Sequence, residues 1–357
     1  MTSLLIQNRV TAALRGAFVA DAASMGTHWI YDPAEMLKTV TSVETPEFRD
    51  PPSPKYYSAT DFPGHYQNGM LSPYGEQLLF VTEHVASTMD LTGDAMSQEM
   101  FQWATTFGGR PDHALTTFID NIKADKKFPE CGADDDQAHI YMKVVPVVAR
   151  YHGKPDLVDR LSQAVRVHQN NQKAVAFGIA AARILEAVIL GAPLEEALET
   201  CQQNIKDDLA NANVPNDAQE ALMEAFQNAK TLGKEKSTLD EILLEVSHQK
   251  MKGNEDSNFY DLAGRSCALP GSFIGPIALF YKSASNAAAS TTLFASALRE
   301  NILASGDTCS RSVFIGAVFA ALAANEKSDS LPSDWVEKMD PETLKKVDAA
   351  IGTIVST

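Results

Sequence analysis

Apolar residues recur along this chain at steps of three and four positions, the spacing that places them on one face of an α-helix. Between residues 4 and 25, Val10, Ala13, Leu14, Phe18 and Ala22 follow this spacing. Alternating apolar and polar positions rich in β-branched residues, which indicate a half-buried strand, are scarce. The pattern therefore predicts an all-α chain.

The same periodicity predicts further helices along the rest of the chain, with lengths of about 10–20 residues that are usual in globular proteins. They are expected near residues 74–88, 94–106, 112–122, 138–152, 156–168, 171–190, 194–205, 215–232, 238–248, 272–283, 290–304, 309–324 and 342–354. No repeat of fixed period and no shift in composition divides the sequence. We therefore expect a single helical domain over residues 1–357.

Three longer loops interrupt the helical pattern, at residues 41–71, 123–136 and 248–272. The first is rich in Pro, Tyr, Asp and Ser. Loops of this length in a compact domain are often functional, and a packed surface excursion is equally compatible with the pattern.

Charge narrows the range of partners. The chain has 46 acidic and 30 basic residues, a formal net charge of −16. Nucleic acids and anionic membranes attract basic surfaces, so we expect neither as a partner.

No apolar stretch reaches the roughly 20 residues of a membrane span. The first 15 residues do not resemble a secretory signal, and the four cysteines are too far apart for a zinc motif. We expect a soluble cytoplasmic protein.

The segment from Ser305 to Arg311 combines a small-residue turn with one carboxylate, Asp307, and the hydroxyl group of Ser310. An apolar helix follows it. The first turn of a helix collects free N–H groups and the positive end of the helix dipole. Asp307 is therefore a candidate for an N-cap or for a metal ligand.

A second carboxylate, Asp21, falls inside a helix of small apolar residues. A buried carboxylate is costly unless it finds a donor or a metal ion, so Asp21 has either a hydrogen-bonding or a site role. The helix ends at His28, Trp29 and Tyr31. These rings either pack around the turn or form the wall of a pocket.

Other candidate residues lie at helix ends. Glu76 and Tyr74 occupy the first turn of a helix that begins at Pro73, where capping alone explains them. His168 lies between two helices and is either a cap or surface group, or a catalytic base. The three aspartates at 134–136 form either a solvated turn or an acidic pocket mouth.

Together these segments resemble the ADP-ribosylglycohydrolase superfamily from Ala13 to Ala324. The matching motifs are the segments 20–22, 132–146, 167–168 and 305–310. Those at 28–32 and 73–77 resemble its J-crystallin branch, which includes lens crystallins. The resemblance implies the compact multi-helix orthogonal bundle of that family.

The resemblance also implies a site that departs from the family pattern. Family enzymes use a pair of Mg²⁺ ions, held by two acidic motifs, to bind the ribose of ADP-ribose. The first motif falls on residues 72–76, which contain no carboxylate pair, and Cys309 replaces an aspartate of the second. Mg²⁺ requires oxygen ligands, and thiolate is a poor substitute. The expected residual site consists of Asp307, Ser310, Cys309, Asp21 and Glu76.

Asp307 is the one metal ligand that the resemblance still points to. We therefore expect no cofactor, and Mg²⁺ only where this residual site functions. The favoured function is that of a non-catalytic, crystallin-like structural protein, a pseudoenzyme of the eye-lens type. Self-association is not specified by any pattern in the sequence.

Two alternatives remain open. The first is a hydrolase with altered chemistry, in which Cys309 is a reactive thiol because a helix start lowers the pKa of a cysteine. The second is a binder of an ADP-ribose-like small molecule. Its aromatic rings would stack on the ligand, in a pocket formed by His28, Trp29, Tyr31, Tyr74 and His168.

Overall fold

The computed structural model describes residues 2–50, 52, 54, 56–252, 260–284, 291–325 and 331–356. Within these ranges the chain forms sixteen α-helices and three short 3-10 helices, and no extended strand. Isolated bridges such as that between Ile30 and Gly306 are the sole β-type pairing among them. The all-α prediction is confirmed.

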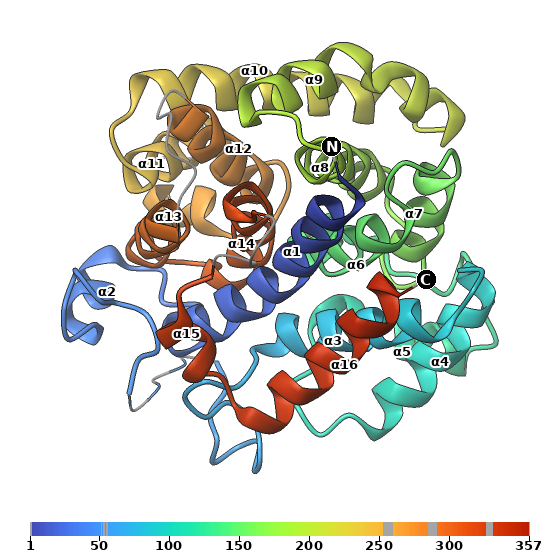
Figure 1. Ribbon diagram of the computed structural model, residues 1–357, viewed down its shortest axis with the longest axis horizontal. Helices are drawn as coiled ribbons and strands as arrows, with labels where there is room; N and C mark the ends of the chain where they lie inside the picture. Colours follow the sequence, from blue (N-terminus) through green and yellow to red (C-terminus); the bar gives the residue numbers. More distant parts are fainter. Residues whose placement is uncertain are drawn as a thin grey trace.

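Two helices lie at the centre of the fold (Figure 1). These are α1 (Ser3–Ser24) and α14 (Thr308–Ala323), and α14 is buried along nearly its whole length. Their backbones touch where two glycines face each other. A Cβ on Gly16 would lie 2.4 Å from the Cβ of Ala320, and one on Gly316 would lie 2.5 Å from the Cβ of Ala20. Small residues on both helices thus permit the close crossing that joins the two ends of the chain.

The other helices surround this pair. Those that contact α1 or α14 directly are α3 (Pro73–Ser87), α6 (Tyr141–Tyr151), α8 (Gln172–Ile189), α12 (Gly271–Ala284), α13 (Thr291–Leu303), α15 (Ser333–Glu337) and α16 (Pro341–Val355). An outer set comprises α2 (Pro33–Thr39), α4 (Gly93–Thr106), α5 (His113–Lys123), α7 (Leu157–Arg166), α9 (Leu194–Asn211), α10 (Asn216–Glu235) and α11 (Leu239–Lys250). The 3-10 helices are η1 (Met25–Thr27), η2 (Ala138–Ile140) and η3 (Tyr260–Arg265). None of the helices in the described part of the chain is long and apolar enough to span a bilayer.

Most expected helices are present, with shifted ends. The helix expected at 138–152 is divided into η2 and α6, and the helix expected to end at 205 continues to Asn211. Two short helices, α2 and α15, were not predicted, and η3 lies in the expected loop 248–272. The start expected at residue 290 falls outside the described residues. Seven residues capped by Asp32 are enough for α2 but too few to show a helical period.

Candidate functional site

The candidate site forms where the end of α1 and the starts of α3 and α14 meet. A backbone bridge fixes this junction: the N–H of Trp29 donates to the carbonyl of Gly306 at 2.9 Å, and the N–H of Gly306 donates to the carbonyl of Ile30 at 2.6 Å. Gly306 has a φ of +76°, a backbone region that favours glycine. The turn before α14 is thereby held against the turn after α1.

Asp307 is completely buried at this junction, and both of its carboxylate oxygens accept hydrogen bonds from the protein. Oδ1 accepts from the indole N–H of Trp29 at 3.0 Å, and Oδ2 accepts from the hydroxyl of Ser310. Nε2 of His28 lies 3.5 Å from Oδ1. Burial raises the pKa of the Asp307 carboxyl, whereas the bond from Ser310 and the charge of Arg311 lower it.

His28 provides the side-chain cap of α14. Its Nδ1 accepts the backbone N–H of Cys309 at 3.2 Å, so in the neutral ring the proton resides on Nε2, which faces Asp307. Burial, reinforced by the charges of Arg311 and Arg110, holds the pKa of His28 well below its usual value. Asp307 occupies the N-cap position of α14, as the N-cap alternative expected, but its side chain makes no capping bond.

Asp21 anchors the start of α3. Its Oδ2 accepts the backbone N–H of Ser72 at 2.8 Å, and its Oδ1 accepts the hydroxyl of Ser72 at 2.6 Å. A Cβ on Gly75 would lie 2.1 Å from Oδ2, so this first turn touches the carboxylate directly. Burial raises the pKa of Asp21 to about 7, against the opposing effect of the hydrogen bonds from Ser72.

The raised pKa of Asp21 predicts a pH-dependent contribution to stability. The folded chain holds this proton more tightly than the unfolded chain, where a carboxyl titrates near pH ~3.9. Protonated Asp21 therefore makes its full contribution to the free energy of unfolding below that pH. This contribution is lost as the pH rises toward about 7. Asp21→Asn removes the titration. The free energy of unfolding of the wild type relative to this variant should fall across that interval in denaturant titrations. Parallel pH profiles of the two proteins would show that Asp21 is not the responsible group.

Cys309 is fully buried in the first turn of α14, and its thiol donates to the backbone carbonyl of Asp21 at 3.7 Å. Burial, reinforced by the charge of Asp21, raises its pKa well above the usual value. The reactive-thiol alternative requires a shift in the other direction. The helix start, which lowers the pKa of a thiol, thus has less effect on Cys309 than burial, which raises it.

Alkylation under native conditions is expected to spare Cys309. Cys267 is half-buried and lines the pocket described below, whereas Cys131, Cys201 and Cys309 are buried. Iodoacetamide should therefore modify Cys267 first, at a low rate because burial also raises its pKa. Peptide mapping by mass spectrometry checks this, with denatured protein as the reference in which all four thiols react. Rapid native labelling of Cys309 would revive the reactive-thiol hypothesis.

Glu76 faces the long loop before α3. One carboxylate oxygen accepts the hydroxyl of Tyr66 at 2.8 Å, and the other lies 2.5 Å from Nδ1 of His65. The hydroxyl of Tyr66 also accepts the backbone N–H of Arg110 at 2.7 Å. Both carboxylate oxygens of Glu76 thus hold the loop against α3.

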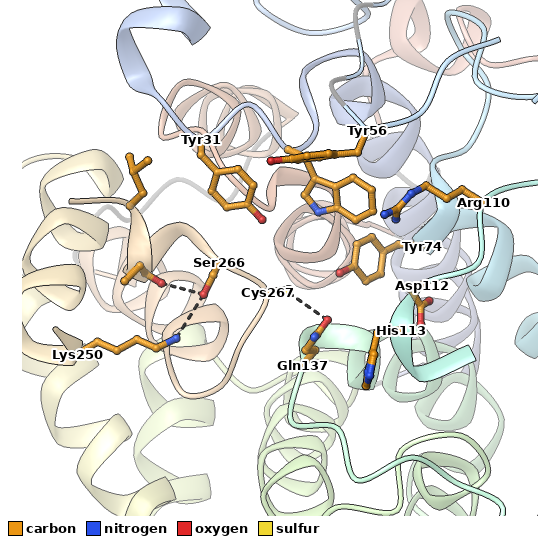
Figure 2. A pocket seen from close by; sticks show the side chains of 13 residues that line it. Tyr31, Tyr56, Tyr74, Arg110, Asp112, His113, Gln137, Lys250, Ser266 and Cys267 are labelled. Carbon is orange, nitrogen blue, oxygen red and sulfur yellow. Dashed lines mark hydrogen bonds between the residues drawn. The ribbon is translucent and has the colours of Figure 1, made fainter. Parts of the chain in front are cut away.

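A pocket of about 500 Å³ opens beside this junction (Figure 2). One tryptophan and three tyrosines form part of its wall, and the guanidinium carbon of Arg110 lies 4.4 Å from the centre of the Trp29 ring. The lining includes Trp29, Tyr31, Tyr56, Tyr74, Arg110, Asp112, His113, Gln137, Lys250, Ser266 and Cys267. Trp29, Tyr31 and Tyr74 therefore line the pocket as predicted, whereas His28 and His168 lie outside its lining. Arg110 and Asp112 were missed because no motif marks them, and Gln137 was not singled out although it lies within the matching segment 132–146.

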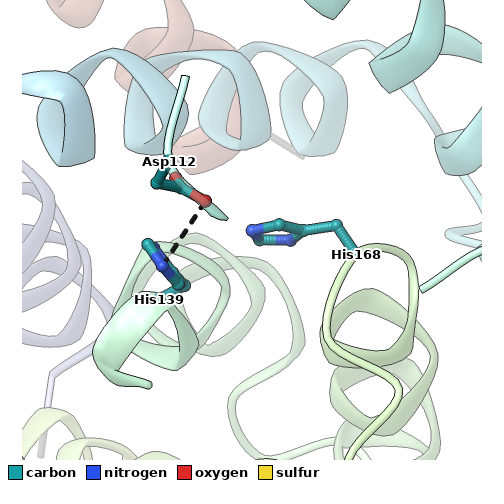
Figure 3. Close-up of side chains that lie close together, drawn as sticks. All are labelled: Asp112, His139 and His168. Atoms are coloured by element: carbon teal, nitrogen blue, oxygen red, sulfur yellow. Dashed lines mark ion pairs between the residues drawn. The ribbon is translucent and has the colours of Figure 1, made fainter. Parts of the chain in front are cut away.

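His168 is fully buried, so the expectation of a surface group is wrong, and its ring nitrogens make no bond to a helix end. Its Nε2 lies 3.2 Å from the Nζ of Lys143, which is also fully buried. Burial holds the pKa of His168 well below its usual value, and the charge of Lys143 adds to this effect. His168 lies close to Asp112 and His139 (Figure 3).

The three consecutive aspartates have different environments. Asp134 is exposed, in agreement with a solvated turn, whereas Asp135 is buried and Asp136 is half-buried. The Asp135 carboxylate accepts the backbone N–H of Gln137 at 3.0 Å and lies 3.3 Å from Nδ1 of His113. Gln137 and His113 both line the pocket, so Asp135 supports that wall from behind.

Comparisons with known proteins agree on one family. Residues 2–354 match the family described as ADP-ribosylglycohydrolase. Crystallin J1A of Tripedalia cystophora is 25% identical over 357 residues, which cover 95% of this chain and 94% of the relative. Crystallin J1B of the same organism is 27% identical over 210 residues, which cover 53% of this chain and 61% of the relative. A solved structure titled ADP-ribosylglycohydrolase-related protein complex superimposes with a TM-score of 0.65 and 15% identity over 98% of both chains. This last likeness shows the fold alone.

Proposed function

The chain belongs to the ADP-ribosylglycohydrolase family, and we propose that it is a crystallin-like member in which a structural role has replaced magnesium-dependent hydrolysis. One observation carries the proposal. Asp307 and Asp21 are both completely buried, and all four of their carboxylate oxygens accept hydrogen bonds from protein donors. The carboxylates from which a metal site would be assembled serve the internal architecture instead.

The residues at this junction do not fit a pair of Mg²⁺ ions. Mg²⁺ binds oxygen ligands in near-octahedral geometry and usually retains several waters. The indole N–H of Trp29 donates a hydrogen bond to the Asp307 carboxylate, and the first turn of α3 at Gly75 packs directly against the Asp21 carboxylate. Cys309 offers a thiol whose raised pKa disfavours the thiolate. The donor set at this junction therefore does not match the ligands that such ions require.

Charge is consistent with a structural role at high concentration. The formal net charge of −16 makes copies of the chain repel one another, which opposes association and precipitation. Two relatives of the chain are crystallins by name. A structural role of this kind needs a stable, well-packed fold and no turnover.

A hydrolysis assay tests the proposal. The protein is incubated with ADP-ribosylated substrates and Mg²⁺, with and without a chelator, beside Asp307→Ala and a catalytically competent family member. The expected result is release of ADP-ribose by the reference enzyme alone. Turnover that disappears both with the chelator and with Asp307→Ala would overturn the proposal.

The pocket favours a second candidate function, the binding of an ADP-ribose-like molecule without hydrolysis. Its aromatic wall offers stacking surfaces for a planar ring, and Arg110 and Lys250 supply positive charge for a phosphate. Binding should raise the melting temperature, equally with and without Mg²⁺. The rise should be lost in Tyr56→Ala, in the pocket wall, and kept in Leu37→Ala, an exposed residue elsewhere. No rise with the wild type would exclude this candidate.

A further inference from the structure

Three side chains of metal-ligand type meet at the edge of the pocket (Figure 3). Asp112 precedes α5, His139 belongs to η2 and His168 follows α7. Each offers one ligand atom, and these atoms all lie within 4.8 Å of one another. The three residues are distant in sequence, so the tertiary fold alone brings them together.

Three of the four ring nitrogens in this cluster lack hydrogen-bond partners; the fourth, Nε2 of His168, faces Lys143. His139 is fully buried, and neither Nδ1 nor Nε2 of its ring has a partner; Nδ1 of His168 has none either. Nε2 of His139 lies 3.5 Å from Oδ1 of Asp112, close enough for an ion pair but without a hydrogen bond. A buried polar group without a partner destabilises the fold, because it has lost its hydrogen bonds to water. Coordination of a cation by ring lone pairs would offset this cost.

We propose that Asp112, His139 and His168 bind a divalent transition-metal ion of the Zn²⁺ class. Two imidazoles and one carboxylate form a donor set that suits zinc or non-haem iron, whereas Mg²⁺ and Ca²⁺ select oxygen ligands. Because Asp112 also lines the pocket, the cluster borders the pocket. This site is separate from Asp307. A failure of this proposal would leave the proposed structural role unaffected, and the reverse also holds.

Ion binding requires a small closure of the cluster. Tetrahedral zinc with ligand distances of about 2.0–2.2 Å places its ligand atoms about 3.4 Å apart. Neighbouring groups already orient the three side chains: the backbone N–H of Leu115 donates to Oδ1 of Asp112 at 2.8 Å, and the ring of Tyr74 stacks on His139 with centroids 4.9 Å apart. Supporting contacts of this kind hold metal ligands in place.

The side chain of Lys143 competes with a metal ion for the space between the three ligands. Its Nζ donates to the carbonyl of His139 at 2.9 Å and lies 3.2 Å from Nε2 of His168. An ammonium group here repels an incoming cation, which is costly in a buried environment. The site therefore binds metal with its lysine displaced or neutral, and replacement of Lys143 by methionine should not weaken the binding.

Zinc affinity of the full-length, tag-free protein tests the proposal. Equilibrium dialysis against Zn²⁺ buffered by a competing chelator measures stoichiometry and affinity, and the visible spectrum of the Co²⁺-loaded protein reports the ligand geometry. We expect one ion per chain. Loss of a direct ligand in His139→Gln or His168→Gln should weaken binding by more than the roughly 10–100-fold effect of an outer-shell partner.

The matched control is His84→Gln. His84 is also buried and also pairs with a carboxylate, that of Glu99 at 2.7 Å, but it does not belong to the cluster. This variant should bind as the wild type does. Should the cluster variants fail to fold, X-ray absorption of the zinc-loaded wild type replaces them, and it should show two imidazole ligands. Absence of binding, equal binding by the His139 and His168 variants, an ion without imidazole ligands, or binding that requires Lys143→Met would each overturn the proposal.

Discussion

Replacement of Gly16 by alanine is expected to lower the free energy of unfolding by about 1–3 kcal/mol, the usual cost of overpacking a core. The added Cβ would lie 2.4 Å from the Cβ of Ala320 and 2.8 Å from the carbonyl oxygen of Gly316. Neither neighbour is a flexible side chain that could turn away, so α1 and α14 must separate. Because this crossing also sets the junction that contains Asp21 and Asp307, the effect should extend to the candidate site.

The control for this change is the same substitution at Gly352. No heavy atom lies within 4 Å of a Cβ built there, and the residue is exposed on α16. Alanine is the better helix former by roughly 0.5–1 kcal/mol, so Gly352→Ala should leave stability unchanged or raise it. Denaturant titrations of both variants measure the difference. Equal effects at the two positions would contradict the close packing of α1 on α14.

Arg311→Met is expected to be the most destabilising single change in the site region, at about 3 kcal/mol or more. The guanidinium is completely buried in the first turn of α14. It donates to the side-chain oxygen of Asn301 at 2.7 Å, to the carbonyl of Arg265 at 3.2 Å and to the carbonyl of Ser305. Methionine fills a similar volume but leaves these acceptors without their donor, and each unsatisfied buried group costs about 1–3 kcal/mol.

Arg15→Met serves as the matched control for the buried arginine. Arg15 pairs with Asp348 at 2.6 Å, with both side chains partly exposed, and an ion pair of this kind is worth at most about 1 kcal/mol. The comparison separates the loss of a charge from the loss of internal hydrogen bonds. A cost at Arg311 no greater than that at Arg15 would show that the turn before α14 does not depend on this guanidinium.

The helical architecture could be predicted from the sequence because amphipathic spacing is a local property. The apolar character of α14 is visible in the sequence, and so are the small residues of α1 around Asp21 that permit a close helix crossing. The short helix α2 could not be found this way. It depends on a cap at Asp32 and on packing against α13 rather than on a repeated pattern.

The candidate site could be predicted in part. Trp29, Tyr31 and Tyr74, which line the pocket, could be predicted because they lie at helix ends next to the family motifs. The burial of His168 could not be foreseen, because segments distant in sequence cover it: the backbone N–H of Ala133 donates to its carbonyl at 3.0 Å. Asp112 lies in a segment without any motif.

The roles of the two carboxylates also depended on tertiary structure. The sequence left Asp21 and Asp307 as either structural groups or ligands, and nothing local distinguishes the two. The deciding contacts come from distant partners, Ser72 for Asp21 and Trp29 for Asp307. Ser310 and Glu76 remain residual-site predictions. The structure places Ser310 on Asp307 and directs Glu76 toward Tyr66 and His65.

The central claim is that Asp307 and Asp21 serve the fold rather than a magnesium site. Calorimetric titration with Mg²⁺ tests it most directly, because it measures binding without any choice of substrate. The account predicts superimposable titrations for the wild type and for Asp307→Asn, with no specific uptake of Mg²⁺ by either. Two ions bound per chain by the wild type, and lost in Asp307→Asn while the variant remains folded, would contradict it.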